Sequence, residues 1–166
     1  MMLEASRKKY PGFQYRTRHP FVGSSALSGA IWMTARQRQV LGDRGVLILS
    51  DGTSQTNVEG WHCVPFLAVN EHHKARTVAY YVGDGAENKA SLVWALRQLE
   101  VMCPRWKAVR QVVFADYGLT ESPYTEAFSE NPLKFFLCAW HWVVKDAPKQ
   151  LRTDTKACCN FLWQLV

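Results

Sequence analysis

The chain has 166 residues, with 20 Lys and Arg against 14 Asp and Glu, and therefore a formal net charge of +6. Residues 1–50 hold eight basic and two acidic side chains, whereas residues 51–166 hold twelve of each. This uneven charge excludes a uniformly basic nucleic-acid coat, and 48% hydrophobic with 13% aromatic residues excludes a largely disordered chain. The length is sufficient for one self-supporting core.

The amino-terminal segment is rich in basic and aromatic residues, and we expect residues 1–28 to form a basic, flexible arm in front of a domain over residues 29–166. Its basic residues are Arg7, Lys8, Lys9, Arg16 and Arg18, and its rings are Tyr10, Phe13 and Tyr15. Basic side chains interleaved with rings suit phosphate contact and base stacking, so these five residues are DNA-binding candidates. A solvated terminus with no binding role is the alternative.

Three strands are predicted next, after a short helix over residues 30–41. Val46–Leu49 is a short apolar run that stops at a turn signal, Asp51-Gly52. Trp61–Val69 and Arg76–Val82 are two further strand-like runs around a polar turn, which together give a three-strand antiparallel meander. Pro65 inside the second run predicts a bulge or an irregular edge there.

Helices and strands then alternate. A helix is predicted to begin at residues 84–87 and to end before Pro104, with an apolar stripe at helical spacing: Leu92, Val93, Leu96, Leu99 and Met102. A strand over 109–115, a helix over 121–128, a strand over 135–138 and a helix from residue 140 follow. The predicted fold class is α/β, with a mixed sheet flanked by helices.

Two carboxylates stand where predicted strands end. Asp51 follows the first strand of the meander, and Asp116 follows the strand that comes after the long helix. If these two strands are neighbours, the carboxylates converge at one rim of the sheet, where oxygen ligands favour Mg²⁺ or Mn²⁺. The alternative is structural, because Asp is common in turns and caps directly after a strand.

Four pieces of sequence around these acids occur in a defined order: the segment 51–57 (Asp-Gly-Thr-Ser-Gln-Thr-Asn), the strand Val64–Val69, Asp116 after a second apolar strand, and Cys138-Ala139-Trp140-His141. In this order they resemble the Mutator-like element (MULE) transposase domain over roughly residues 30–150. Each piece alone is common, whereas their order and spacing together are fairly specific to this family.

The resemblance implies an RNase H-like fold with a DDE-type active site, in which Asp51 and Asp116 are the first two catalytic carboxylates. The implied reaction is DNA cleavage and strand transfer by two-metal phosphodiester chemistry with Mg²⁺ or Mn²⁺. The family's third acid, a Glu, lies well downstream of the Cys-x-x-His pair, and only 25 residues follow His141 here. The domain is therefore expected to be incomplete at its carboxyl end, and its catalytic activity stays open.

Three further residues are accessory candidates. Glu87 is the acid of the long helix, where ribonuclease H itself has a metal ligand, but Asp84 and Glu87 also fit a capping box. Cys138 and His141 have the spacing of half a zinc site, yet no second pair of matching spacing exists, so zinc is not favoured. The resemblance places this pair beside the active site, while a buried Cys next to a hydrogen-bonded His is the structural alternative.

Two other functions remain open: a non-catalytic DNA-binding remnant of a transposase, and an inactive fragment that serves only as an interaction module. The expected partners are transposon ends and target DNA, with self-association left open and no membrane contact. Five cysteines, an odd number that includes the adjacent pair Cys158-Cys159, do not fit a disulfide framework and favour a reducing compartment. The expected location is therefore intracellular, in the nucleus or the cytoplasm.

Overall fold

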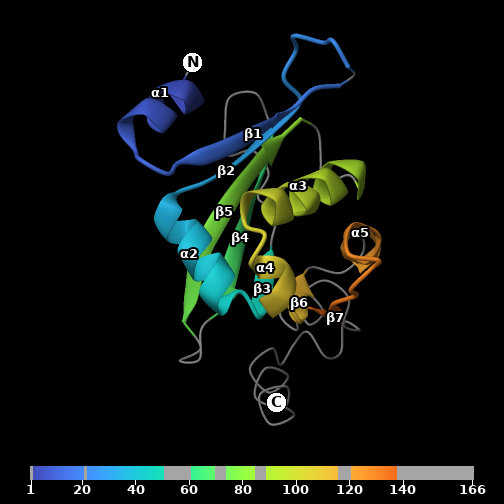
Figure 1. The fold of residues 1–166 in the computed structure, drawn as a ribbon. Coiled ribbons are helices and arrows are strands. Elements are labelled where there is room, and N and C mark those ends of the chain that lie inside the picture. The colour runs from blue at the N-terminus through green and yellow to red at the C-terminus, as the bar shows by residue number, and fades with distance from the viewer. Residues whose placement is uncertain are drawn as a thin grey trace, which may run out of the picture.

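The computed structural model describes residues 2–20, 22–50, 61–69, 74–84, 89–115 and 121–137. Their helices are α1 (Met2–Lys9), α2 (Ala35–Arg44), α3 (Lys89–Met102), α4 (Trp106–Val109) and α5 (Glu121–Ala127). Their strands are β1 (Gln14–Arg18), β2 (Gly29–Met33), β3 (Leu47–Ser50), β4 (His62–Val69), β5 (Ala75–Gly83), β6 (Val112–Ala115) and β7 (Lys134–Leu137). These strands form one sheet with helices packed on it (Figure 1).

The sheet is mixed, and its strand order is β1-β2-β5-β4-β3-β6-β7. The strands β3, β4 and β5 form an antiparallel meander, as the sequence predicts. β6 then lies parallel beside β3, and β7 lies parallel beside β6. The predicted α/β class, with three antiparallel strands before alternating helices and strands, is therefore confirmed.

A bulge interrupts the pairing of β4 with β5 next to Pro65. Phe66 pairs with Ala79 and Leu67 pairs with Thr77, so Val78 is the extra residue, and it lies in β5. Val78 and Ala79 are both fully buried, which breaks the alternation of a regular strand. The irregularity predicted from Pro65 is confirmed, although the extra residue belongs to the partner strand.

The helices α2, α3 and α4 lie over one face of the sheet, which we call the helix face (Figure 1). Strand side chains on this face are buried in the core, among them Ile31, Ile48, Phe66 and Val113. The stripe predicted for α3 is buried against them: Leu92, Val93, Leu96, Leu99 and Met102. α3 also ends before Pro104, as predicted. Burial of each such side chain contributes about 1.5–3 kcal/mol, so this layer dominates the stability of the fold.

The predicted helix over residues 30–41 is wrong in its first part, because Gly29–Met33 forms β2 between β1 and β5. The helix α2 begins only after Thr34, which forms a capping box with Gln37: each side chain accepts a hydrogen bond from the other residue's backbone N–H. The Thr-x-x-Gln pattern was visible in the sequence and marks the true start of this helix.

The amino-terminal segment differs from the predicted flexible arm. Residues 2–9 form α1, and β1 pairs antiparallel with β2 from Gln14↔Met33 to Arg18↔Gly29. β1 is thus an edge strand of the same sheet. The reason is long-range, since β2 offers an open edge that no local pattern in residues 1–28 reveals.

Two further strand boundaries are shifted. The strand predicted over 109–115 begins at Val112, because the short helix α4 occupies Trp106–Val109. The strand predicted over 135–138 is β7, Lys134–Leu137. The helix predicted from residue 140 and the capping box of Asp84 with Glu87 fall wholly or partly outside the described residues.

Candidate metal and nucleic-acid sites

The strands that precede the two candidate aspartates lie side by side. β3 and β6 are parallel neighbours with the register Leu47↔Val112 to Ser50↔Ala115, so they end level with each other. The condition under which the two carboxylates converge, that these strands are neighbours, is therefore met. Asp51 and Asp116 follow Ser50 and Ala115 directly in the sequence and lie outside the described residues. We call the carboxyl ends of β3 and β6 the acid end.

The helix α5 is fastened to the acid end. The Ser50 hydroxyl, at the last position of β3, hydrogen-bonds the Tyr124 hydroxyl of α5 at 2.5 Å, and both residues are buried. The Tyr124 ring packs against Phe128 and against Phe135 of β7, with ring centroids 6.4 and 6.2 Å apart. A buried polar pair inside an aromatic cluster gives the acid end a rigid support.

The same helix reaches the beginning of α3. Lys89, the first residue of α3, forms an ion pair with Glu126 of α5, with 2.9 Å between Nζ and Oε2. The Lys89 hydrogen bond and charge lower the pKa of Glu126 below its ordinary value. Glu87 stands two residues before Lys89 and, like Cys138 and His141, lies outside the described residues.

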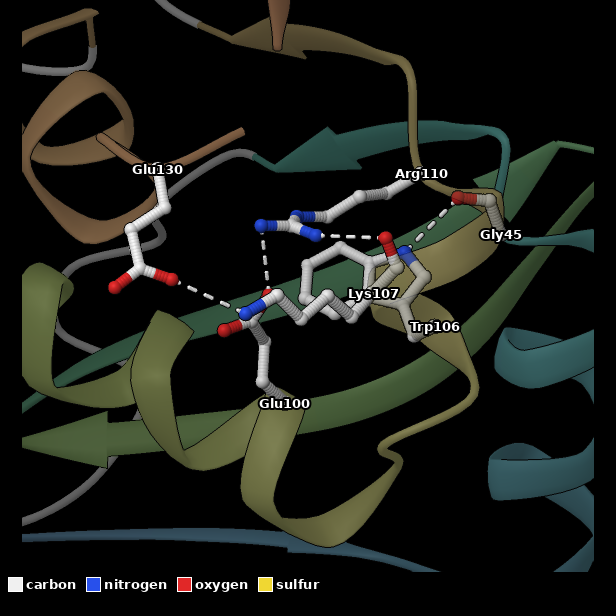
Figure 2. Close-up of polar contacts among 6 residues, drawn as sticks. All are labelled: Gly45, Glu100, Trp106, Lys107, Arg110 and Glu130. Carbon is white, nitrogen blue, oxygen red and sulfur yellow. Dashed lines mark hydrogen bonds and ion pairs between the residues drawn. The ribbon is translucent and has the colours of Figure 1, made fainter. Parts of the chain in front are cut away.

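A buried arginine fixes the chain just before β6 (Figure 2). The Arg110 side chain is 2% exposed and forms an ion pair with Glu100 of α3 at 2.8 Å. It also donates a hydrogen bond to the Lys107 carbonyl at 2.9 Å and lies 4.4 Å from the centroid of the Phe128 ring. Burial lowers the pKa of Arg110, and the Glu100 carboxylate opposes that shift. Arg110 therefore joins α3, α4 and the turn that follows α5 at one point.

Trp106 of α4 fixes the chain before β3 in the same region (Figure 2). Its indole N–H donates to the Gly45 carbonyl at 2.9 Å. A Cβ at Gly45 would lie 2.7 Å from Trp106 Cδ1 and 2.3 Å from the Leu41 carbonyl oxygen, so glycine is required for this close approach. The amino ends of β3 and β6 are thereby tied together, which sets the register that brings their carboxyl ends level.

The predicted DNA-binding residues divide into two groups. Arg7, Lys8 and Lys9 are exposed on the last turn of α1, and Arg16 is exposed on β1. Arg18 is different, since its guanidinium donates a hydrogen bond to the hydroxyl of Ser91, a fully buried residue of α3. We call the first four residues the basic cluster; Arg18 instead connects the edge strand to the helix layer.

A hollow of about 400 Å³ lies within the basic cluster, along the free edge of β1. Its lining combines charge, amide, hydroxyl and rings: Arg7, Phe13, Gln14, Tyr15, Arg16 and Thr17. The Tyr15 hydroxyl donates to the carboxylate of Glu4 on α1, which raises the pKa of Tyr15. The hydrogen bond holds α1 beside β1, so Arg7 and Arg16 face one hollow.

The sheet face opposite α2, α3 and α4 carries an aromatic row that the sequence reading missed. Trp32 of β2 stacks on Tyr80 of β5, with ring centroids 5.8 Å apart and an interplanar angle of 23°. The residue opposite Trp32 in β1 is Tyr15, and the residue opposite Tyr80 in β4 is Pro65. The sequence did not indicate Trp32 because a helix is predicted over residues 30–41. In a strand, the neighbouring residues Ile31 and Trp32 point to opposite faces of the sheet.

Within the described part of the chain, no three His, Cys, Asp or Glu side chains lie close enough together to hold a metal ion. Cys63 and Cys103, which belong to that part, carry free thiols. None of its helices is long and apolar enough to cross a bilayer.

No protein-family model matches the chain, and neither a curated protein nor a solved structure matches it.

Proposed function

We propose that the chain is an RNase H-like domain of the DDE type, related to MULE transposases, which cleaves DNA by two-metal phosphodiester chemistry. The observation that carries the proposal is the pairing of β3 with β6, which ends level at Ser50↔Ala115 immediately before Asp51 and Asp116. The meander β3-β4-β5, followed by β6 and β7, supports the RNase H-like assignment.

Chain connectivity limits how far the two aspartates can separate. Paired residues of neighbouring strands lie about 4.8 Å apart, and each aspartate is one Cα–Cα step of about 3.8 Å further on, so their Cα atoms lie within about 12 Å. Carboxylates on side chains of this length can share a pair of metal ions across such a gap. The donor set, which consists of oxygen atoms only, fits Mg²⁺ or Mn²⁺.

Glu87 is the third acid that the fold favours. The helix α5 contacts the end of β3 through Tyr124 and the start of α3 through Glu126, two residues apart on the same helix. α5 therefore links Lys89, two residues after Glu87 in the sequence, to the acid end. We propose Glu87 as the third carboxylate of the set.

In the proposed mechanism Asp51 and Asp116 would hold the two ions, and Glu87 would supply further oxygen ligands. When bound, such ions activate the attacking water or 3′-hydroxyl and stabilise the leaving oxygen at phosphorus. The contribution of the chain is positional, because Tyr124, Arg110 and Trp106 fix the strands that carry the first two acids.

The test is nicking of a supercoiled plasmid in the presence of Mg²⁺ or Mn²⁺. We expect Asp51→Asn and Asp116→Asn each to reduce the nicking rate at least about 100-fold, because each removes a negative ligand from the metal site. We expect Glu87→Gln to reduce the rate about 10-fold or more. Glu130→Gln is the matched control, since this acid is highly exposed and pairs only with Lys107 among the described residues. Nicking that survives both Asp variants would refute the site.

A non-catalytic DNA-binding protein is the second candidate function. The basic cluster favours it, because Arg7 and Arg16 line a hollow on β1, an edge strand four positions away from β3 in the sheet. DNA binding there needs no carboxylates and no metal. Metal-independent binding without any nicking by the unaltered chain would select this function over the first.

A further inference from the structure

We propose that the sheet face opposite α2, α3 and α4 binds single-stranded DNA, with Trp32 and Tyr80 stacking on bases and the basic side chains of α1 (Arg7, Lys8 and Lys9) contacting phosphates. The choice of DNA as the nucleic acid rests on the proposed function. The surface itself is defined by the aromatic row, the hollow along β1 and the position of the charges.

The aromatic row is built into the sheet. Trp32 and Tyr80 are direct cross-strand partners, and their stacked rings are partly exposed. The neighbouring residues Ile31, Met33 and Tyr81 are buried on the helix face, so the sheet fixes which way Trp32 and Tyr80 point. With Tyr15 beside Trp32, the row crosses β1, β2 and β5 over about 10 Å. Rigid rings held in a row are a platform on which successive bases stack.

The charges of α1 lie at the β1 end of this row, because the hydrogen bond from Tyr15 to Glu4 holds α1 there, whereas Arg16 pairs with Ile31 and alternates onto the helix face. Tyr15 belongs both to the row and to the hollow that Arg7 and Arg16 line. Lys9 lies over the Tyr10 ring at 5.3 Å, at the end of α1. A strand of nucleic acid on the rings therefore meets guanidinium and ammonium groups for its phosphates at the edge of the sheet. This combination of a stacking row and a flanking positive charge selects nucleic acid over a neutral apolar partner.

Single strands fit this surface better than duplexes. The bases of a duplex are stacked on each other, and only their edges reach a protein, whereas the faces of unpaired bases are free to stack on side chains. A duplex could contact the basic cluster but would leave Trp32 and Tyr80 unused. The face is therefore expected to bind frayed or displaced strands.

The row also points toward the acid end. Pro65, which pairs with Tyr80, is one residue away from Phe66, and Phe66 pairs with Ser50 at the end of β3. The aromatic row thus lies level with the place where the chain leaves β3 toward Asp51. A single strand bound along the row would continue across β4 to the proposed carboxylates.

The experiment measures binding of a fluorescently labelled 20-nucleotide single strand, and of the same sequence as a duplex, in EDTA without divalent metal. We expect tighter binding of the single strand. Trp32→Leu should weaken single-strand binding about 10-fold with little effect on the duplex, while Trp32→Phe, which keeps a ring, should stay within about 3-fold of the unaltered protein. Because no metal is present, failure of the proposed nuclease would not affect this result.

The charges are tested by salt dependence. Arg7→Gln should reduce the slope of log affinity against log salt by about 0.7, the value for one phosphate contact on a single strand. Lys134→Gln is the matched control, because Lys134 is exposed on β7 at the other edge of the sheet and should leave the slope unchanged. An equal change in both variants would mean diffuse attraction and would overturn the site.

Photocross-linking of the unaltered protein to iodouridine-labelled single-stranded DNA covers the case in which a Trp32 variant does not fold. Mass spectrometry should find the cross-link on Trp32 or Tyr80. Cross-links confined to other aromatic residues, or duplex binding at least as tight as single-strand binding, would overturn the proposal.

Discussion

The basic cluster and the acid end occupy different parts of one sheet and are held in different ways. The basic cluster lies on exposed positions of α1 and β1, and its contacts include an Arg7–Glu4 pair at 3.9 Å and Lys9 over the Tyr10 ring, while the hydrogen bond from Tyr15 to Glu4 holds α1 beside β1. The acid end is supported by buried groups, namely the Ser50–Tyr124 hydrogen bond and Arg110. A charged surface needs only accessibility, whereas a pair of metal ligands needs fixed geometry.

This contrast also gives the charge distribution a structural meaning. The whole net charge of +6 belongs to residues 1–50, which contribute α1, β1, β2, α2 and β3. The electrically neutral remainder contributes β4 to β7 and the helices that support the acid end. The surface that would attract nucleic acid and the support of the candidate reaction site therefore come from successive parts of the chain.

The largest expected effect tests the supports of the acid end. Arg110→Met should lower the free energy of unfolding by about 3 kcal/mol, because it leaves the Glu100 carboxylate, whose side chain is 22% exposed, without its ion-pair partner. Arg16→Met, in the basic cluster, should change it by less than about 0.5 kcal/mol because Arg16 is exposed. Urea unfolding measures both values.

A second substitution shows whether the loss comes from the unpaired carboxylate. Adding Glu100→Leu to Arg110→Met should recover part of the stability, since an apolar pair has no charge left to solvate. If Arg110→Met and Arg16→Met lowered the free energy of unfolding equally, the acid end would not be more rigidly supported than the basic cluster.

The sequence predicts the middle of the fold well because its signals there are local. The apolar runs that became β3, β4 and β5 are bounded by turn residues, and the α3 stripe repeats at helical spacing. The same reasoning places Asp51 and Asp116 directly after strands, whereas the pairing of those strands comes from the structure. The helix prediction is wrong for residues 30–33, because a largely buried strand with apolar residues on both faces has no alternation and its local pattern resembles that of a helix.

The supports of the acid end could not be predicted from sequence. Arg110 looks like any surface arginine until α3, α4 and the turn that follows α5 converge on it, and Ser50 and Tyr124 are 74 residues apart. Nothing near Tyr15 indicates that β1 adds to the sheet beside β2. Contacts of this kind depend on the packing of distant segments and leave no periodic trace in the chain.

A smaller effect is expected at the hydrogen bond between α5 and β3. Tyr124→Phe should cost about 1–2 kcal/mol, because the buried Ser50 hydroxyl loses its partner. A double-mutant cycle with Ser50→Ala isolates this pair from the other contacts of Tyr124, and we expect a coupling of about 1 kcal/mol. The corresponding cycle for Tyr15→Phe with Glu4→Gln should give a smaller coupling, since that pair is more exposed. A larger coupling energy for the Tyr15–Glu4 pair than for the Ser50–Tyr124 pair would contradict the expectation that the acid end is held more firmly than the basic cluster.

The smallest effects concern pH, and the two regions should respond at opposite ends of the scale. Lys89 lowers the pKa of Glu126 from its ordinary 4.5, so the stabilisation is present above this value and is lost as the pH falls through the lowered pKa. Glu4 raises the pKa of Tyr15 from its ordinary 10.0, so the stabilisation is present below pH 10 and is lost as the pH rises through the raised pKa. Urea midpoints should therefore fall more steeply below pH 4.5 for the unaltered protein than for Glu126→Gln, and more steeply above pH 10 than for Tyr15→Phe. If a variant and the unaltered protein gave parallel curves in one of these pH ranges, the corresponding interaction, Lys89–Glu126 or Tyr15–Glu4, would not stabilise its region.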